Sequence, residues 1–170
     1  MNDAESRLVR DAQRGESKAV QELFRRHWPS AWQAAYAVTG RRELANDAAQ
    51  EAFSRAISSL DTFDARRPLR PWVTKIAVNA AIDELRREGR LSFIDEPESI
   101  VVEPAEDPND VLNAVTRLSA DRRVIVALHY WLDYSTPEIA ELLDLPLGTV
   151  ASRLSRALDE LRLNLEAEHV

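Results

Sequence analysis

The chain has 170 residues, no cysteine and a formal net charge of −7, because 29 aspartates and glutamates outnumber 22 lysines and arginines. This length allows one ordinary domain or two small ones. The lack of cysteine excludes a disulfide-stapled module, a thiolate metal site and a cysteine nucleophile. The sequence has no run of about 18 apolar residues and it starts with an acidic stretch, so we expect neither a membrane span nor a signal peptide.

The excess negative charge lies in one segment of the chain. Residues 91–113 carry seven acidic and no basic side chains, whereas residues 1–90 have a net charge of +3 and residues 114–170 a net charge of −3. The acidic segment also contains three of the eight prolines and has no sustained apolar period. We therefore expect an extended linker between two small folded domains, of which the first is net basic and suited to nucleic acid.

Both flanking parts show the three- or four-residue apolar spacing of helices, punctuated by glycines. In the first part this spacing predicts a short helix before Gly15, a longer helix that ends at Gly40, and helices over 42–59 and 69–88. Pro29 predicts a kink or a break in the longer helix. In the second part the spacing predicts helices over 109–118, 121–131, 137–143 and 147–165. Segments with a period of two residues are missing, so the predicted fold is all-α.

The predicted helix over 69–88 carries a polar stripe between two apolar flanks. On a helical wheel one narrow line contains Trp72, Lys75, Asn79, Asp83 and Arg86. Cations, an amide and an aromatic ring suit an unstacked base, because bases present π-faces and hydrogen-bonding edges. The alternative interpretation is that Trp72 belongs to the core and the polar residues are merely solvated.

The helices over 137–143 and 147–165 have the layout of a helix-turn-helix unit. Thr136 is a good N-cap, Pro137 suits the first helical position, and Asp144-Leu145-Pro146 forms the turn. On the second helix the apolar residues share one side, and the opposite, exposed side contains Thr149, Ser152, Arg153 and Arg156. Hydroxyls and arginines near a helix N-terminus suit base edges and phosphates. An ordinary helical hairpin with solvated arginines is the alternative.

Three segments occur in a recognisable order and spacing: Asp47–Phe53, Pro71–Arg87 and Glu138–Ala157. Together they resemble the extracytoplasmic-function (ECF) group of the sigma-70 family, whose members direct core RNA polymerase to promoters, and the resemblance covers about residues 5–165. It implies two small helical domains, one similar to sigma region 2 (residues 1–90) and one similar to the helix-turn-helix region 4 (residues 114–170). The acidic linker, residues 91–113, resembles the segment that these factors thread through the polymerase channels.

The resemblance also implies roles for individual residues. Contact with the largest polymerase subunit is implied for Asp47, Gln50, Glu51 and Phe53. Recognition and melting of the −10 element is implied for Phe63, Arg66, Arg67, Trp72, Lys75, Asn79, Asp83, Arg86 and Arg87, with the loop over 60–69 receiving a flipped base. Recognition of the duplex −35 element is implied for Thr149, Ser152, Arg153 and Arg156. The family usually has Lys or Arg where this chain has Ala151, which puts one phosphate contact in doubt.

The implied partners are core RNA polymerase, promoter DNA and an anti-sigma factor, for a cytoplasmic protein that is a monomer or a heterodimer with the anti-sigma factor. We expect no enzyme activity, metal or cofactor, because the three histidines are isolated and no known catalytic or phosphate-binding motif occurs. A dimeric helix-turn-helix repressor that binds duplex operators alone explains the C-terminal half equally well. It gives no role to the polar stripe, to residues 47–53 or to the linker. A degenerate sigma-like adaptor is a third alternative.

Overall fold

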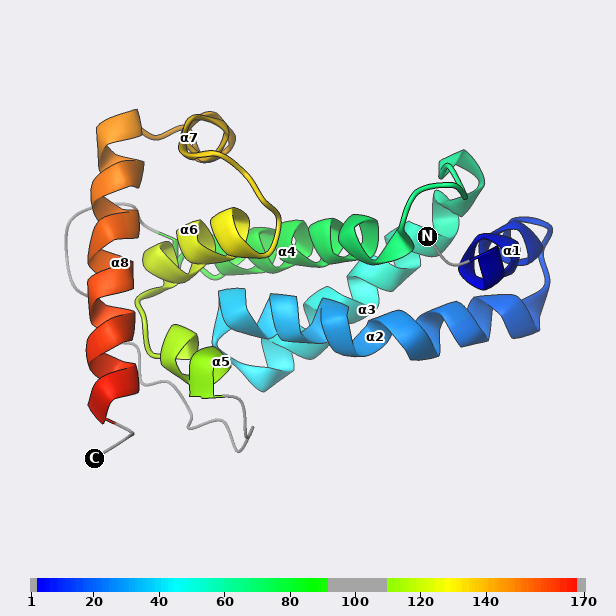
Figure 1. The fold of residues 1–170 in the computed structure, drawn as a ribbon, viewed down its shortest axis with the longest axis horizontal. Helices are drawn as coiled ribbons and strands as arrows, with labels where there is room; N and C mark the ends of the chain where they lie inside the picture. The colour runs from blue at the N-terminus through cyan, green and yellow to red at the C-terminus, as the bar shows by residue number, and fades with distance from the viewer. Residues whose placement is uncertain (1–2, 92–109, 168–170) are drawn as a thin grey trace.

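The computed structural model describes residues 3–91 and 110–167, and within these ranges the chain is helical, with no strand (Figure 1). The first part contains α1 (Asp3–Gln13), α2 (Ser17–Thr39), α3 (Arg42–Ser58), the 3₁₀ turn η1 (Leu60–Thr62) and α4 (Leu69–Arg87). The second part contains α5 (Asp110–Thr116), α6 (Ala120–Tyr130), α7 (Thr136–Leu143) and α8 (Leu147–Ala167). The all-α prediction is confirmed. Most of the predicted acidic linker lies outside the described residues.

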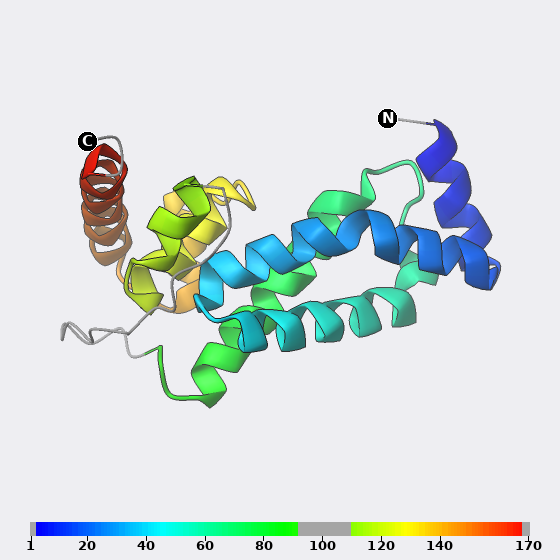
Figure 2. The same ribbon diagram turned by 90° about the horizontal axis from the view of Figure 1, so that it is seen from below.

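The first part is a bundle in which α2, α3 and α4 pack against one another and α1 lies across the N-terminal end of α2 (Figures 1 and 2). Small side chains let these helices approach closely, since alanines of α2, α3 and α4 are fully buried in the bundle. One apolar cluster at the α1 end joins α1, α2, α3 and the first turns of α4. The bundle therefore holds α3 and α4 rigidly and leaves one face of each to solvent.

In the second part α5, α6 and α7 pack against α8, which runs across the end of the bundle (Figure 1). A second apolar cluster contains residues of α5, α6, α7 and α8, and it continues into the first part of the chain. Val38 of α2, Ile82 of α4 and Ile125 of α6 all belong to it and are almost fully buried. The two parts of the chain thus share one hydrophobic core in this conformation.

Pro29 does not break α2, because the helix continues through it from Ser17 to Thr39 and is held on both sides by buried residues. One local prediction is wrong. The N-cap of α7 is Ser135 and not Thr136, because Ser135 and Glu138 form a capping box: the Ser135 main-chain N–H donates to Glu138 Oε2 over 2.8 Å. Hydrogen bonds from the Ser135 hydroxyl and then from its main-chain N–H lower the pKa of Glu138.

Candidate nucleic-acid interface

The polar stripe predicted on α4 is present as a partly exposed line along that helix. Lys75 and Arg86 are exposed, and Trp72, Asn79 and Asp83 are half-buried. The residues on both flanks are buried in the bundle, among them Val73, Ala77, Val78, Ala81 and Ile82. The prediction that a polar and aromatic line separates two apolar flanks is therefore confirmed.

Near its C-terminal end the stripe is engaged in ion pairs. Asp83 lies 3.7 Å from Arg55 of α3 and 3.9 Å from Arg86, and Arg87 pairs with Glu84. The arginines of these pairs are about half exposed or more, so each pair contributes little to stability and exchanges readily with a phosphate. Arg86 and Arg87 remain available to a DNA backbone.

The loop between η1 and α4 places an aromatic pair beside the start of the stripe. The Phe63 ring lies 4.7 Å from the Trp72 ring, in a tilted arrangement, and both side chains are half-buried. Gln13 of α1 holds the loop from behind, because its amide donates to the Leu60 and Phe63 carbonyls over 2.9 and 2.8 Å. Helix α1 therefore anchors the loop through the Leu60 and Phe63 carbonyls, and α4 anchors it through the contact of Trp72 with the Phe63 ring.

The arginines of this loop differ in their surroundings. Arg66 donates to both carboxylate oxygens of Asp64 over 2.9 Å, and this hydrogen bonding lowers the pKa of Asp64 to about 2. Arg67 is exposed and lines a groove of about 1000 Å³ together with Phe63, Trp72 and Lys75. Four of the nine residues predicted to bind the −10 element thus meet at one opening.

The opposite wall of this groove belongs to the second part of the chain. It contains the last residue of α6, the loop between α6 and α7 and the first turn of α7, namely Tyr130, Trp131, Leu132, Asp133, Tyr134 and Glu138. Lys75 of α4 lies over the Tyr134 ring, with Nζ 5.2 Å from the ring centre. A cation over an aromatic face is attractive, so the two walls are joined by a direct contact.

The residues predicted to contact the polymerase lie on α3, but they do not form one surface. Asp47, Gln50 and Glu51 are exposed, and Glu51 pairs with Arg55 over 2.8 Å. Phe53 is only 5% exposed, and its ring packs 4.7 Å from the ring of Phe24. Phe53 therefore supports the bundle from inside.

The helix-turn-helix geometry predicted for α7 and α8 is present. Asp144 ends α7 in the left-handed conformation, with φ 55° and ψ 48°, which a short polar side chain tolerates. The Leu145 main-chain N–H donates back to the Ala140 carbonyl over 2.9 Å, so the chain turns sharply before α8 begins at Leu147. Ile139 and Val150 are fully buried and join the two helices.

Three of the four residues predicted to read the −35 element lie where the sequence places them. Ser152 and Arg156 are exposed and Thr149 is half-buried. Arg153 differs: it is 8% exposed, and its Nη1 lies 3.6 Å from Asp121 of α6. The expectation that Arg153 belongs to the exposed face is wrong, because α8 turns this position toward α6.

Several residues of this interface were missed by the sequence interpretation. Arg70 lines the same groove as Arg67, and the α6–α7 loop supplies the facing wall. Only the three-dimensional packing shows these positions, since nothing in their local sequence distinguishes them from solvated residues. Within residues 3–91 and 110–167, no group of three or more His, Asp or Glu side chains could hold a metal ion. In the same ranges no helix is long and apolar enough to cross a membrane.

Two protein-family models match the chain over its two helical parts. The sigma-70 region 2 model matches residues 23–91, and the sigma-70 region 4 model matches residues 109–161. The chain is 30% identical to the ECF RNA polymerase sigma factor SigL of Mycobacterium tuberculosis, over 93% of this chain and 95% of that protein.

Solved structures agree with these matches. CnrH, in complex with the cytosolic domain of CnrY, is 29% identical with a TM-score of 0.56, over 97% of this chain and 99% of CnrH. The sigma factor RpoE of Bartonella quintana, in complex with the anti-sigma factor NepR, is 26% identical with a TM-score of 0.55, over 86% of this chain and 96% of RpoE. The chain therefore belongs to the ECF sigma factors of the sigma-70 family.

Proposed function

We propose that this protein is an alternative sigma factor that binds core RNA polymerase in the cytoplasm and recognises promoters through two separate surfaces. The stripe on α4 and the Phe63–Trp72 pair bind the melted −10 element, and the exposed N-terminal part of α8 binds the −35 duplex. Asp47, Gln50 and Glu51 on α3 contact the polymerase. The observation that carries this proposal is the meeting of Phe63, Arg67, Trp72 and Lys75 at one groove.

The chemistry of this groove suits a single strand better than a duplex. Aromatic rings offer stacking surfaces to an unpaired base, and Arg67 and Lys75 offer positive charge to the phosphates. Asn79, one turn further along α4, is half-buried and can hydrogen-bond to a base edge. A repressor that reads only duplex DNA has no use for this arrangement.

On α8, Ser152 and Arg156 reach the major groove from an exposed helix face near the N-terminus. Because Arg153 is buried against α6, we assign it a supporting role in this domain. Ala151 is exposed on the same helix and supplies no phosphate contact. The −35 surface is therefore small, and Arg156 is its main cationic residue.

We also propose that an anti-sigma factor holds this protein inactive, as the complex of Bartonella quintana RpoE with NepR suggests. A surface suited to an apolar partner is present where α2 and α3 meet. Phe24 and Ile57 are 40% and 48% exposed there, beside a small apolar cavity lined by α2, α3 and α4. Apolar side chains gathered in this way are typical of a protein-binding site.

Transcription with purified bacterial core RNA polymerase tests the proposed function. A promoter library is first selected with the holoenzyme, and run-off transcripts are then measured on the selected promoter. Asn79→Ala is expected to reduce open-complex formation while leaving polymerase binding intact, and Gln50→Ala is the reciprocal control that weakens polymerase binding. Tight duplex binding by the chain alone, with no transcripts when polymerase is present, would instead indicate a repressor.

A further inference from the structure

We propose that Gln13, the last residue of α1, is a positioning residue for −10 recognition: its amide fixes the loop that carries Phe63 and so sets the preference for one base of the −10 element. This inference rests on the proposed function of the −10 surface, because a fixed loop selects a base only if the loop binds DNA. It adds a residue of α1, a helix that contributes nothing to the lining of the groove and carries none of the residues predicted to bind DNA.

The Gln13 amide bridges the two ends of the 3₁₀ turn η1. Its Nε2 donates to the Leu60 and Phe63 carbonyls over 2.9 and 2.8 Å. The atom that faces both carbonyls has to be the amide nitrogen, because the amide oxygen has no hydrogen to donate. An amide nitrogen carries two hydrogens, so the two bonds use its full donor capacity. Glutamine thus supplies two neutral donors at one point, as no other side chain of this length does.

The loop depends on these bonds because its own side chains give it little anchorage. Leu60 and Leu69 are buried at its two ends, but none of residues 61–68 between them is buried. The Phe63 main-chain N–H donates to the Leu60 carbonyl over 3.1 Å, which shapes the turn but does not tie it to the bundle. The Gln13 bonds provide that tie.

Phe63 is held on two sides, through its carbonyl and through its ring. The carbonyl accepts from Gln13, and the ring lies 4.7 Å from the Trp72 ring of α4. Because both groups have fixed partners, the main-chain and the side-chain torsions of Phe63 are both restrained. The loop therefore presents one arrangement of this ring before DNA arrives, which lowers the entropy cost of binding a base.

Helix α1 gives the Gln13 amide a fixed position. Val9 and Ala12 of α1 are buried in the same apolar cluster as Leu60. Near the start of the helix, Glu5 lies 2.8 Å from His27 of α2. The helix is thus tied to the bundle along its length, and its last side chain carries that position to the loop.

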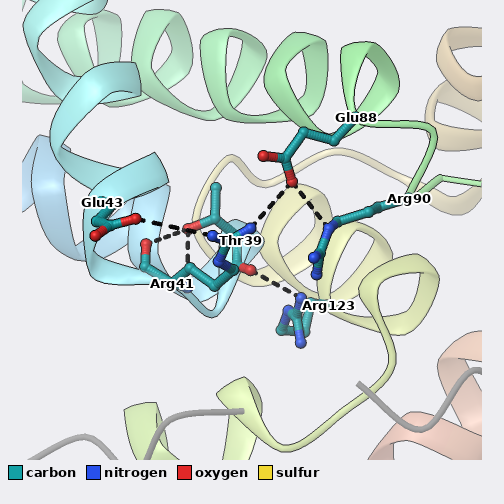
Figure 3. Close-up of polar contacts among 6 residues, drawn as sticks. All are labelled: Thr39, Arg41, Glu43, Glu88, Arg90 and Arg123. Carbon is teal, nitrogen blue, oxygen red and sulfur yellow. Dashed lines mark hydrogen bonds and ion pairs between the residues drawn. The ribbon is translucent and has the colours of Figure 1, made fainter. Parts of the chain in front are cut away.

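The opposite end of the bundle is held by other residues. There Arg123 of α6 is buried, and its Nη2 donates to the Thr39 carbonyl at the end of α2 over 3.0 Å (Figure 3). Gly40 leaves room for this guanidinium, because a Cβ at Gly40 would lie 2.9 Å from Cζ of Arg123. Since α2 has 23 residues, about 33 Å separate its two ends. Substitution of Gln13 is therefore expected to disturb the loop and to leave these contacts intact.

The base preference of the holoenzyme tests the role of Gln13. The probe is the non-template −10 segment of the selected promoter, as labelled single-stranded DNA, with a set of probes in which each base is replaced in turn. The ratio of Kd for the replaced and the original base gives the preference at each position. Attraction to the phosphates affects both values equally, so it cancels in this ratio.

Gln13→Met keeps the length of the side chain but removes both donors. It is expected to lower the preference at one −10 position about tenfold or more, since two neutral hydrogen bonds of ordinary net strength correspond to such a factor. The other positions are expected to keep their preference. Gln13→Glu should lower it at least as much, because its carboxylate would face two carbonyl oxygens. Gln13→Lys restores a donor and is expected to stay within about threefold of the parent protein.

Gln21→Met is the matched control, because Gln21 is exposed on α2. It is expected to show the base preferences of the parent protein. Polymerase binding and binding of a duplex −35 probe are measured for every variant, and both are expected to match the parent. An unchanged base preference in Gln13→Met would overturn the proposal. An equal loss at every −10 position would also overturn it, because that result indicates damage to the whole domain.

Thermal unfolding shows whether Gln13→Met folds. If it does not, the comparison of Gln13→Glu with Gln13→Lys decides, and equal base preferences in these two variants would overturn the proposal. The proposed function fails in a different way, namely by a parent holoenzyme that shows no base preference at any −10 position and makes no transcripts. The parent protein is measured first, so the two failures can be told apart.

Discussion

Arg153 of α8 lies 3.6 Å from Asp121 of α6, and its side chain is only 10% exposed. This pair joins α8, which carries the proposed −35 surface, to α6, at a position where the sequence pattern predicts a DNA contact. Arg156, one turn further along α8, is exposed. Two arginines three residues apart therefore have different roles, and substitutions can separate them.

Arg153→Met is expected to reduce the free energy of unfolding by about 2 kcal/mol, because it removes the cation from a largely buried ion pair with Asp121. Thermal or urea unfolding measures this change. Arg156→Met is the matched control, and we expect it to leave stability within about 0.5 kcal/mol of the parent protein. Equal stability of the two variants would show that the Arg153 pair is dispensable.

Arg156→Ala is expected to weaken −35 binding by the holoenzyme by about 1–3 kcal/mol, since its guanidinium is placed to reach a base edge or phosphate. Holoenzyme binding to a duplex −35 probe, titrated with salt, measures the effect. Arg162→Ala provides a control on the same helix, because Arg162 is exposed and pairs with Asp159 over 3.6 Å. If Arg162→Ala weakened binding of the −35 probe as much as Arg156→Ala does, the loss of one positive charge from the protein would explain both results, and Arg156 would have no specific contact.

Asp47→Lys is expected to weaken the binding of core polymerase without a change in melting temperature, because the Asp47 side chain is exposed on α3. Phe53→Ala should lower the melting temperature without weakening polymerase binding. We expect it to destabilise the fold by about 3 kcal/mol, because the Phe53 ring is packed against Phe24 and Trp28. Polymerase titration and thermal unfolding separate the two effects. Glu43→Lys reproduces the charge change of Asp47→Lys at the start of α3, and normal binding by that variant is the required control.

His27 is expected to make stability depend on pH. Its Nε2 lies 2.8 Å from Glu5 of α1, which favours the charged imidazole, but burial has the larger effect and lowers the pKa of His27. The unfolded chain therefore binds this proton more readily than the folded one. The stabilisation is complete above the unfolded pKa of 6.5 and is lost as the pH falls below it.

Melting temperatures measured from about pH 7.5 to about pH 5.5 should consequently fall by a few degrees on acidification. His27→Gln is expected to flatten this dependence, and His129→Gln is expected to retain it. A parent protein that becomes more stable on acidification would show that the Glu5 carboxylate outweighs burial.

The sequence by itself determined which segments are helical and which side of each helix is apolar, because both follow from local spacing of side chains. The stripe from Trp72 to Arg86 and the turn at Asp144 are local in this sense, and the family resemblance follows from motifs of the same kind. The tertiary structure decided which polar residues are buried. Arg153 and Arg123 lie on helices whose own sequences allow exposure, and their partners are 32 and about 85 positions away in the chain. Such burial depends on which helix covers a given face, and local periodicity carries no information about that choice. The same reason explains why the net charge of −7 and the separate linker suggest two independent domains, whereas the folded chain joins them through Arg123, Gly40 and one shared core.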